Sequence, residues 1–102
     1  HVEAARNLAQ RIIKEGGAKN EARIEWAWRT VTSRRPEASE TQVVVDLLPL
    51  HEARFSEDLE AAQNLIAYGE SSPDKTILPR ELAAWTLVAN LFLNLDEVVN
   101  KN

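Results

Sequence analysis

Hydrophobic and polar residues alternate with the period of an α-helix in five segments of the chain. In the first segment, residues 2–15, apolar residues recur at steps of three and four, with charged or amide residues between them. Gly16 and Gly17 follow, and glycine commonly supplies the left-handed residue that ends a helix. The pattern therefore predicts a first helix whose apolar face is formed by Val2, Ala5, Leu8, Ala9, Ile12 and Ile13.

A second helix is predicted from about Asn20 to Thr32, with Asn20 as its N-cap. It ends before Pro36, because the residue that precedes a proline is pushed away from helical geometry. Trp26 lies on nearly the opposite side of this helix from the core positions. Those core positions are Ile24, Ala27, Trp28 and Val31.

The third helix is predicted to begin at Ser39, because Ser39 and Gln42 have the spacing of a capping box. Pro49 falls inside this segment, where it removes one backbone hydrogen bond and crowds the preceding turn. We therefore expect a kink or a break near residues 45–48. The residues predicted to share the inner face are Val44, Leu47, Leu48, His51 and Phe55.

Two further helices follow. The fourth is predicted from about Asp58 to Tyr68, and Gly69 stops it. After a nine-residue loop, Pro79 suits the first position of a fifth helix that reaches about Val99.

The fifth helix is apolar over most of its circumference. At 100° per residue, its polar residues form one narrow strip, and the remaining positions are almost all apolar. A surface helix needs only one apolar stripe, so this helix is expected to be central and packed on two or more sides. The strip, expected to face solvent or to bond to backbone, consists of Thr86, Asn90, Asn94 and Glu97.

The elements together predict an all-α fold, a compact bundle of about five helices with a central C-terminal helix. The length of 102 residues corresponds to a single domain over residues 1–102. The chain has no Met, so we expect it to be an excised piece of a larger protein.

Charge and composition narrow the functional classes. The net charge is −4, and the basic residues are spread singly except for Arg34 and Arg35, so no nucleic-acid partner is expected. The absence of Cys excludes thiolate catalysis, thiolate metal sites and the C-x-x-C-H haem attachment. The longest apolar stretch is too short for a membrane span. We expect no cofactor and a chain that is monomeric or weakly associating.

The run YGESSPDKTILPRELAAWTLVANLFLNLDEVV, residues 68–99, resembles the C-terminal end of a planctomycete domain of unknown function (domain-of-unknown-function family 1553). Three further stretches resemble that family in the same order, VEAARNLAQRIIKEGGA, EARIEWAWRTVTSRRP and HEARFSEDLEAAQNLIAYGES. Trp26 and Pro49 depart from the family pattern. The resemblance implies that the chain is the C-terminal piece of an exported, periplasmic or cell-surface protein that is associated with c-type cytochromes. It carries over no catalytic residue.

Few residues of the chain suggest chemistry. His51 is the only interior histidine and lacks a second ligand at helical spacing, so a metal or haem site is not expected. Ser71 and Ser72 have no oxyanion-hole motif, and turn chemistry explains them better. The acidic pairs Glu57–Asp58 and Asp96–Glu97 are better explained as helix-end groups than as glycosidase carboxylates.

The aromatic residues leave one candidate for an interaction. Trp28 and Trp85 lie on apolar stripes and are expected in the core, whereas Trp26 is the candidate contact with something outside the chain. A platform of Trp26, Trp28, Trp85 and Tyr68 for sugar rings is a weaker alternative. The leading hypothesis is a structural or protein-interaction module that binds the remainder of its parent chain or another protein. The alternative is the terminal part of an enzyme or a cytochrome-linked electron-transfer unit whose active groups lie upstream.

Overall fold

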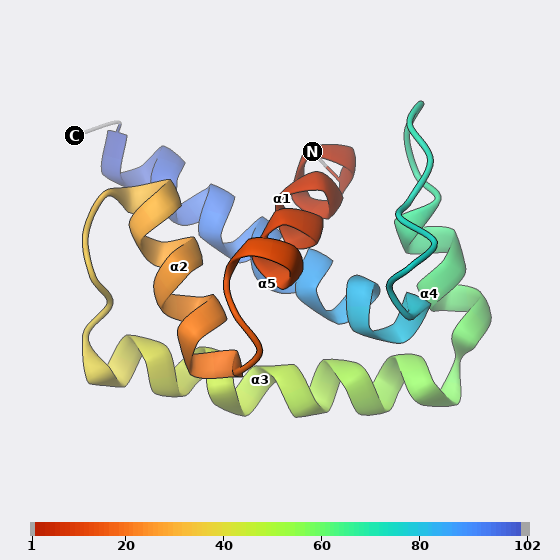
Figure 1. The fold of residues 1–102 in the computed structure, drawn as a ribbon, viewed down its shortest axis with the longest axis horizontal. Helices are drawn as coiled ribbons and strands as arrows, with labels where there is room; N and C mark the ends of the chain where they lie inside the picture. The colour runs from red at the N-terminus through yellow and green to blue at the C-terminus, as the bar shows by residue number, and fades with distance from the viewer. Residues whose placement is uncertain (1, 101–102) are drawn as a thin grey trace.

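The computed structural model describes the backbone of residues 2–100 and the side chains of residues 2–95. Within this part of the chain every regular element is a helix and no strand is present, which confirms the predicted all-α fold. The elements follow the order α1 (Val2–Glu15), α2 (Asn20–Thr32), α3 (Ala38–Glu57), α4 (Leu59–Ile66) and α5 (Pro79–Asn100). Figure 1 shows α3 along one edge of the molecule and α5 crossing behind α1 and α2.

α5 is the centre of the bundle, as its apolar circumference predicts. It packs against each of the other four helices, and its largest contact is with α1. Trp85, Val88 and Phe92 are buried, and the ring of Phe92 meets Trp28 of α2 edge-to-face at a centroid distance of 5.3 Å. Residues from all five helices therefore share one apolar core.

The polar strip of α5 behaves largely as expected. Asn90 and Asn94 are exposed. Thr86 is buried, and its hydroxyl donates to the Leu82 carbonyl at 2.7 Å within the same helix. The side chain of Glu97 lies outside the described residues.

The beginnings of α2 and α3 differ from the prediction. Lys19, not Asn20, is the N-cap of α2, and its carbonyl accepts the first helical hydrogen bond from the Arg23 N–H. α3 begins at Ala38 with Glu37 as its N-cap, so the predicted Ser39 cap is wrong.

Glu40 explains the earlier start of α3. Its carboxylate accepts the backbone N–H of Glu37 at 2.8 Å, and both of its oxygens bond to the Arg34 guanidinium at 2.9 Å. The Arg34 hydrogen bonds, followed by that from Glu37, lower the pKa of Glu40 to about 2. An ionised Glu40 thus holds the entry to the helix in place of a serine hydroxyl.

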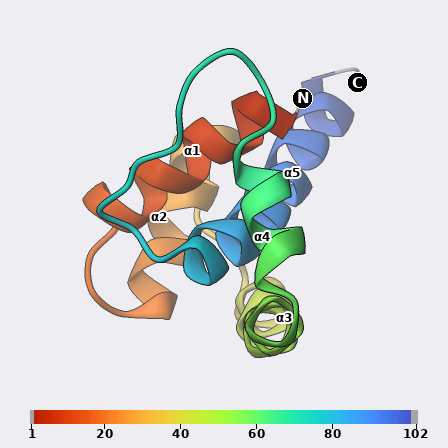
Figure 2. The same cartoon turned by 90° about the vertical axis from the view of Figure 1, so that its right-hand side faces the viewer.

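Pro49 does not interrupt α3, which is assigned as one helix from Ala38 to Glu57. Figure 2 looks along α3 and shows its turns superimposed as a ring. The predicted break is therefore wrong. Pro49 is exposed, so its ring lies on the solvent side of α3, and the Val45 carbonyl that loses its donor is one turn earlier on the same side.

Candidate interaction surface

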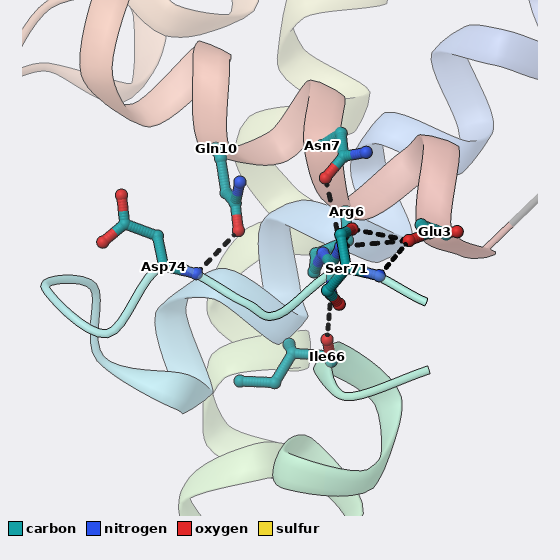
Figure 3. A network of polar contacts seen from close by, with 7 residues as sticks. All are labelled: Glu3, Arg6, Asn7, Gln10, Ile66, Ser71 and Asp74. Carbon is teal, nitrogen blue, oxygen red and sulfur yellow. Dashed lines mark hydrogen bonds and ion pairs between the residues drawn. The ribbon is translucent and has the colours of Figure 1, made fainter. Parts of the chain in front are cut away.

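Ser71 lies in the loop between α4 and α5 and is tied to α1 (Figure 3). Its backbone N–H and its hydroxyl donate to the Glu3 carboxylate at 2.7 and 2.5 Å. The fully buried Arg6 donates to the carbonyls of Ile66 and Ser71 at 2.8 and 2.9 Å, and also to the Ser71 hydroxyl oxygen. The Ser71 hydroxyl thus donates to the Glu3 carboxylate and accepts from the Arg6 guanidinium.

This arrangement does not suit nucleophilic catalysis. The hydrogen bonds from the Ser71 hydroxyl and backbone, in that order, lower the pKa of Glu3. A carboxylate with a lowered pKa is a poorer proton acceptor, whereas an activating base works best with a pKa near the working pH. The contacts of Ser71 are therefore structural. They join the loop to α1 across 68 positions of the sequence. The predicted turn chemistry involves only neighbouring residues, so it does not account for these contacts.

Asp74 makes the second attachment of the same loop to α1. Its backbone N–H donates to Gln10 at 2.9 Å, and its carboxylate forms an ion pair with Lys14. The hydrogen bonds from Lys14 and then Thr76 lower the pKa of Asp74 to about 2. We call residues 67–78 the strap, because polar contacts hold them against α1. The feature of the sequence that could have indicated the strap is Arg6, a charged residue at helical spacing from the apolar residues Val2 and Ala9.

The acidic pairs lie at helix ends or outside the described side chains. The Asp58 carboxylate accepts the Ala61 N–H at 3.0 Å and caps α4, which agrees with the helix-end interpretation. The side chains of Asp96 and Glu97 lie outside the described residues. Among residues 2–95, no three His, Cys, Asp or Glu side chains converge on a position that suits a metal ion.

The aromatic side chains do not form a common platform. Trp28 and Trp85 are buried in the core, as predicted, and Tyr68 is exposed on the strap. Trp26 is half-buried, and the Arg11 guanidinium lies 5.3 Å from the centre of its ring. Trp26 also lines a shallow hollow, together with Gly16, Ala22, Glu25, Arg29 and Thr30.

An apolar groove lies between α3 and α5. Its volume is about 380 Å³, and its walls are α3 residues on one side and α5 residues on the other. A smaller hollow of about 250 Å³ continues it toward the start of α3, and Leu91 borders both. The groove is lined by Leu47, His51, Leu87, Val88, Asn90, Leu91 and Asn94.

His51 is the titratable residue of this groove. Burial and then the nearby charge of Arg54 lower the pKa of His51. The imidazole is therefore neutral at neutral pH, and the groove presents amide and imidazole groups without a formal charge. Its described neighbours in the groove are apolar side chains and amides, which are poor partners for a shared metal ion.

The outer side of α3 adds a second apolar feature. Val43, Leu47 and Leu50 stand at successive turns, and Val43 and Leu50 are 55% and 67% exposed. We call these three residues the outer stripe. The sequence placed Leu47 in the core face, but the structure leaves it half-buried, because only Val44, Leu48 and Phe55 point fully inward. An i, i+4, i+7 spacing of Val43, Leu47 and Leu50 was the signal for the stripe.

No membrane-crossing segment is found among the described helices, none of which is both long and apolar enough. A comparison with protein-family models finds no matching family, and comparisons with curated proteins and with solved structures find no match.

Proposed function

We propose that this chain is a structural or protein-interaction module of a larger exported protein, and that it binds its partner through the outer stripe and the adjoining groove. The observation that carries the proposal is the second apolar stripe of α3. The resemblance to the planctomycete domain of unknown function supports the exported location.

The outer stripe is surplus to the core. α3 already buries Val44, Leu48 and Phe55 against the rest of the bundle. Burial of apolar surface is favourable by a free energy of roughly 25 cal/mol per Å². The exposed part of the outer stripe does not contribute this free energy within the chain. Contiguous exposed apolar residues of this kind commonly mark binding surfaces.

The groove beside the stripe suits a helical partner. Two helices form its walls, its floor is apolar, and its polar side chains are neutral. An amphipathic helix binds such a groove with apolar residues at three- and four-residue spacing. A charged small molecule finds no opposite charge among the residues that line it.

Site-specific photocrosslinking in the intact natural protein tests the proposal. A photoreactive residue in place of Leu50 should give one discrete adduct, mapped to a single segment of the parent chain or of one partner. The matched control is the same residue in place of Gln63, which is exposed on α4.

Two results decide the outcome. A discrete adduct at position 50 that disappears when Leu47 is replaced by Lys supports the proposal. Equal, diffuse labelling at positions 50 and 63 contradicts it. If Leu47→Lys abolishes a turnover of the parent while its folding and assembly are unchanged, the enzymatic alternative is favoured.

A further inference from the structure

We infer that the outer stripe binds a second copy of this chain, with the two α3 helices packed antiparallel across a two-fold axis at Leu50. This inference rests on the proposed function, because it names the partner of the same surface. It is carried by two charges that flank the most exposed leucine of the chain.

Asp46 and Arg54 stand four residues before and four residues after Leu50. Residues four apart lie almost in line along a helix and are separated by about 6 Å of rise. The three side chains therefore form one row, acid then leucine then base. Asp46 and Arg54 are exposed, and neither forms an ion pair with another described side chain.

Asp46 is also oriented by its own helix. The Gln42 side chain donates to one carboxylate oxygen at 2.8 Å, and the other oxygen is left to accept a further donor. A guanidinium from another molecule supplies such donors in a planar pair.

An antiparallel second copy satisfies both charges at once. When Leu50 of one copy meets Leu50 of the other, each Asp46 faces the Arg54 of the opposite helix. The same arrangement places Leu47 beside Ala53 of the second copy. It also places Val43 beside Glu57 of the second copy, where the apolar contact ends. A parallel arrangement brings like charges together and is disfavoured, so the charge pattern selects the antiparallel dimer.

The contact is isologous, so every interaction occurs twice. It involves about three turns of one helix, which is smaller than the surface of a permanent dimer. We therefore expect a dissociation constant roughly between 10 µM and 1 mM. This range agrees with a chain that is monomeric when dilute and associates when concentrated.

Analytical ultracentrifugation of the 102-residue chain between about 10 µM and 1 mM, at low salt, tests the inference by charge exchange. Asp46→Arg and Arg54→Asp should each weaken the dimer at least tenfold, because each creates like-charge contacts across the two-fold axis. The double variant Asp46→Arg/Arg54→Asp should restore it. Glu60→Arg, which changes the net charge as Asp46→Arg does but lies on α4, should leave it unchanged.

A wild-type chain that is monomeric at 1 mM overturns the inference, and so does a double variant that stays as monomeric as its single parents. Circular dichroism of each variant ensures that a monomer is a folded monomer. The crosslinking experiment separates this inference from the proposed function. A monomeric chain whose position 50 still gives one adduct with a different protein refutes the dimer and supports the interaction module.

Discussion

The two sides of the bundle use their surplus residues in opposite ways. On the strap side, polar residues of the types found in catalytic sites have a structural role, since Ser71 and Asp74 hold residues 67–78 against α1. On the α3 side, apolar residues that resemble core are left in water, as the exposure of Leu50 shows. Residue type alone thus misleads in both directions, and the partner of each side chain decides its role.

The comparison also separates stability from binding. Each polar contact of the strap has a partner within the chain, so its loss lowers the free energy of unfolding. The outer stripe has no such partner, so its loss changes association while the fold is maintained. Substitutions in the strap should therefore change the free energy of unfolding, whereas substitutions in the outer stripe should change association.

Trp85 lies in the core beneath both sides and sets the scale of the effects. It is fully buried, so Trp85→Ala should lower the free energy of unfolding by about 3–5 kcal/mol through lost burial and a cavity. Chemical denaturation followed by circular dichroism measures the loss. A variant as stable as wild type would show that α5 is not the centre of the bundle.

Arg6 should have the next largest effect, on the strap side. Arg6→Met keeps the bulk of the side chain but leaves the buried Ile66 carbonyl and the Ser71 carbonyl without their donor. We expect a loss of about 3 kcal/mol in urea denaturation. The matched control is Arg11→Met on the same helix, where an exposed ion pair with Glu15 is removed and the loss should stay below about 1 kcal/mol. Equal losses would show that the strap is not held by Arg6.

Acid should weaken the strap side selectively. The pKa of Asp74 is about 2 in the folded chain, below its ordinary 3.8, so its contribution is present above about pH 4 and is lost as pH falls toward 2. The pKa of Glu3 is lowered as well and acts in the same direction. Urea midpoints from pH 6 to pH 2 should fall less steeply for Asp74→Asn than for wild type. Parallel curves would contradict the attachment, and Glu40 accounts for part of the remaining slope.

The smallest effect on stability is expected at Leu50. Leu50→Lys should change the free energy of unfolding by less than about 0.5 kcal/mol, because the side chain is already in water. Leu48, two residues earlier, is fully buried, and Leu48→Ala should lose about 2–5 kcal/mol. A large loss at Leu50 in dilute solution would show that the outer stripe packs within the chain.

The helical periodicity of the sequence was sufficient for the fold. Apolar spacing located all five helices, and the narrow polar strip of Thr86, Asn90 and Asn94 identified the central one. The start of α3 could not be predicted, because a serine and a glutamine at capping distance competed with Glu40, whose advantage depends on Arg34 in the preceding loop. The effect of Pro49 was misjudged because its cost depends on whether its ring faces solvent or the core, and in the structure Pro49 is exposed.

The candidate surface was less predictable than the fold. Leu47 has the same helical spacing from Val44 and Phe55 as a core residue, and only the position of α5 leaves it at the rim of the groove. The strap depends on contacts between residues 60 or more positions apart, which no local pattern encodes. Trp26 packs partly against the core and lies beside Arg11, and it stays a candidate contact through the part that is still exposed.

The contact between α1 and α5 has a consequence for synthesis on the ribosome. Of the five helices, α1 is synthesised before the others, yet its largest partner is α5, which is synthesised after them. Translation adds about 5–20 residues per second, so the apolar face of α1 waits several seconds until α5 has been synthesised. During that interval the nascent chain lacks a closed core, and its early helices are suited to capture by a chaperone. A stop shortly before Pro79 would leave every other helix without its common neighbour.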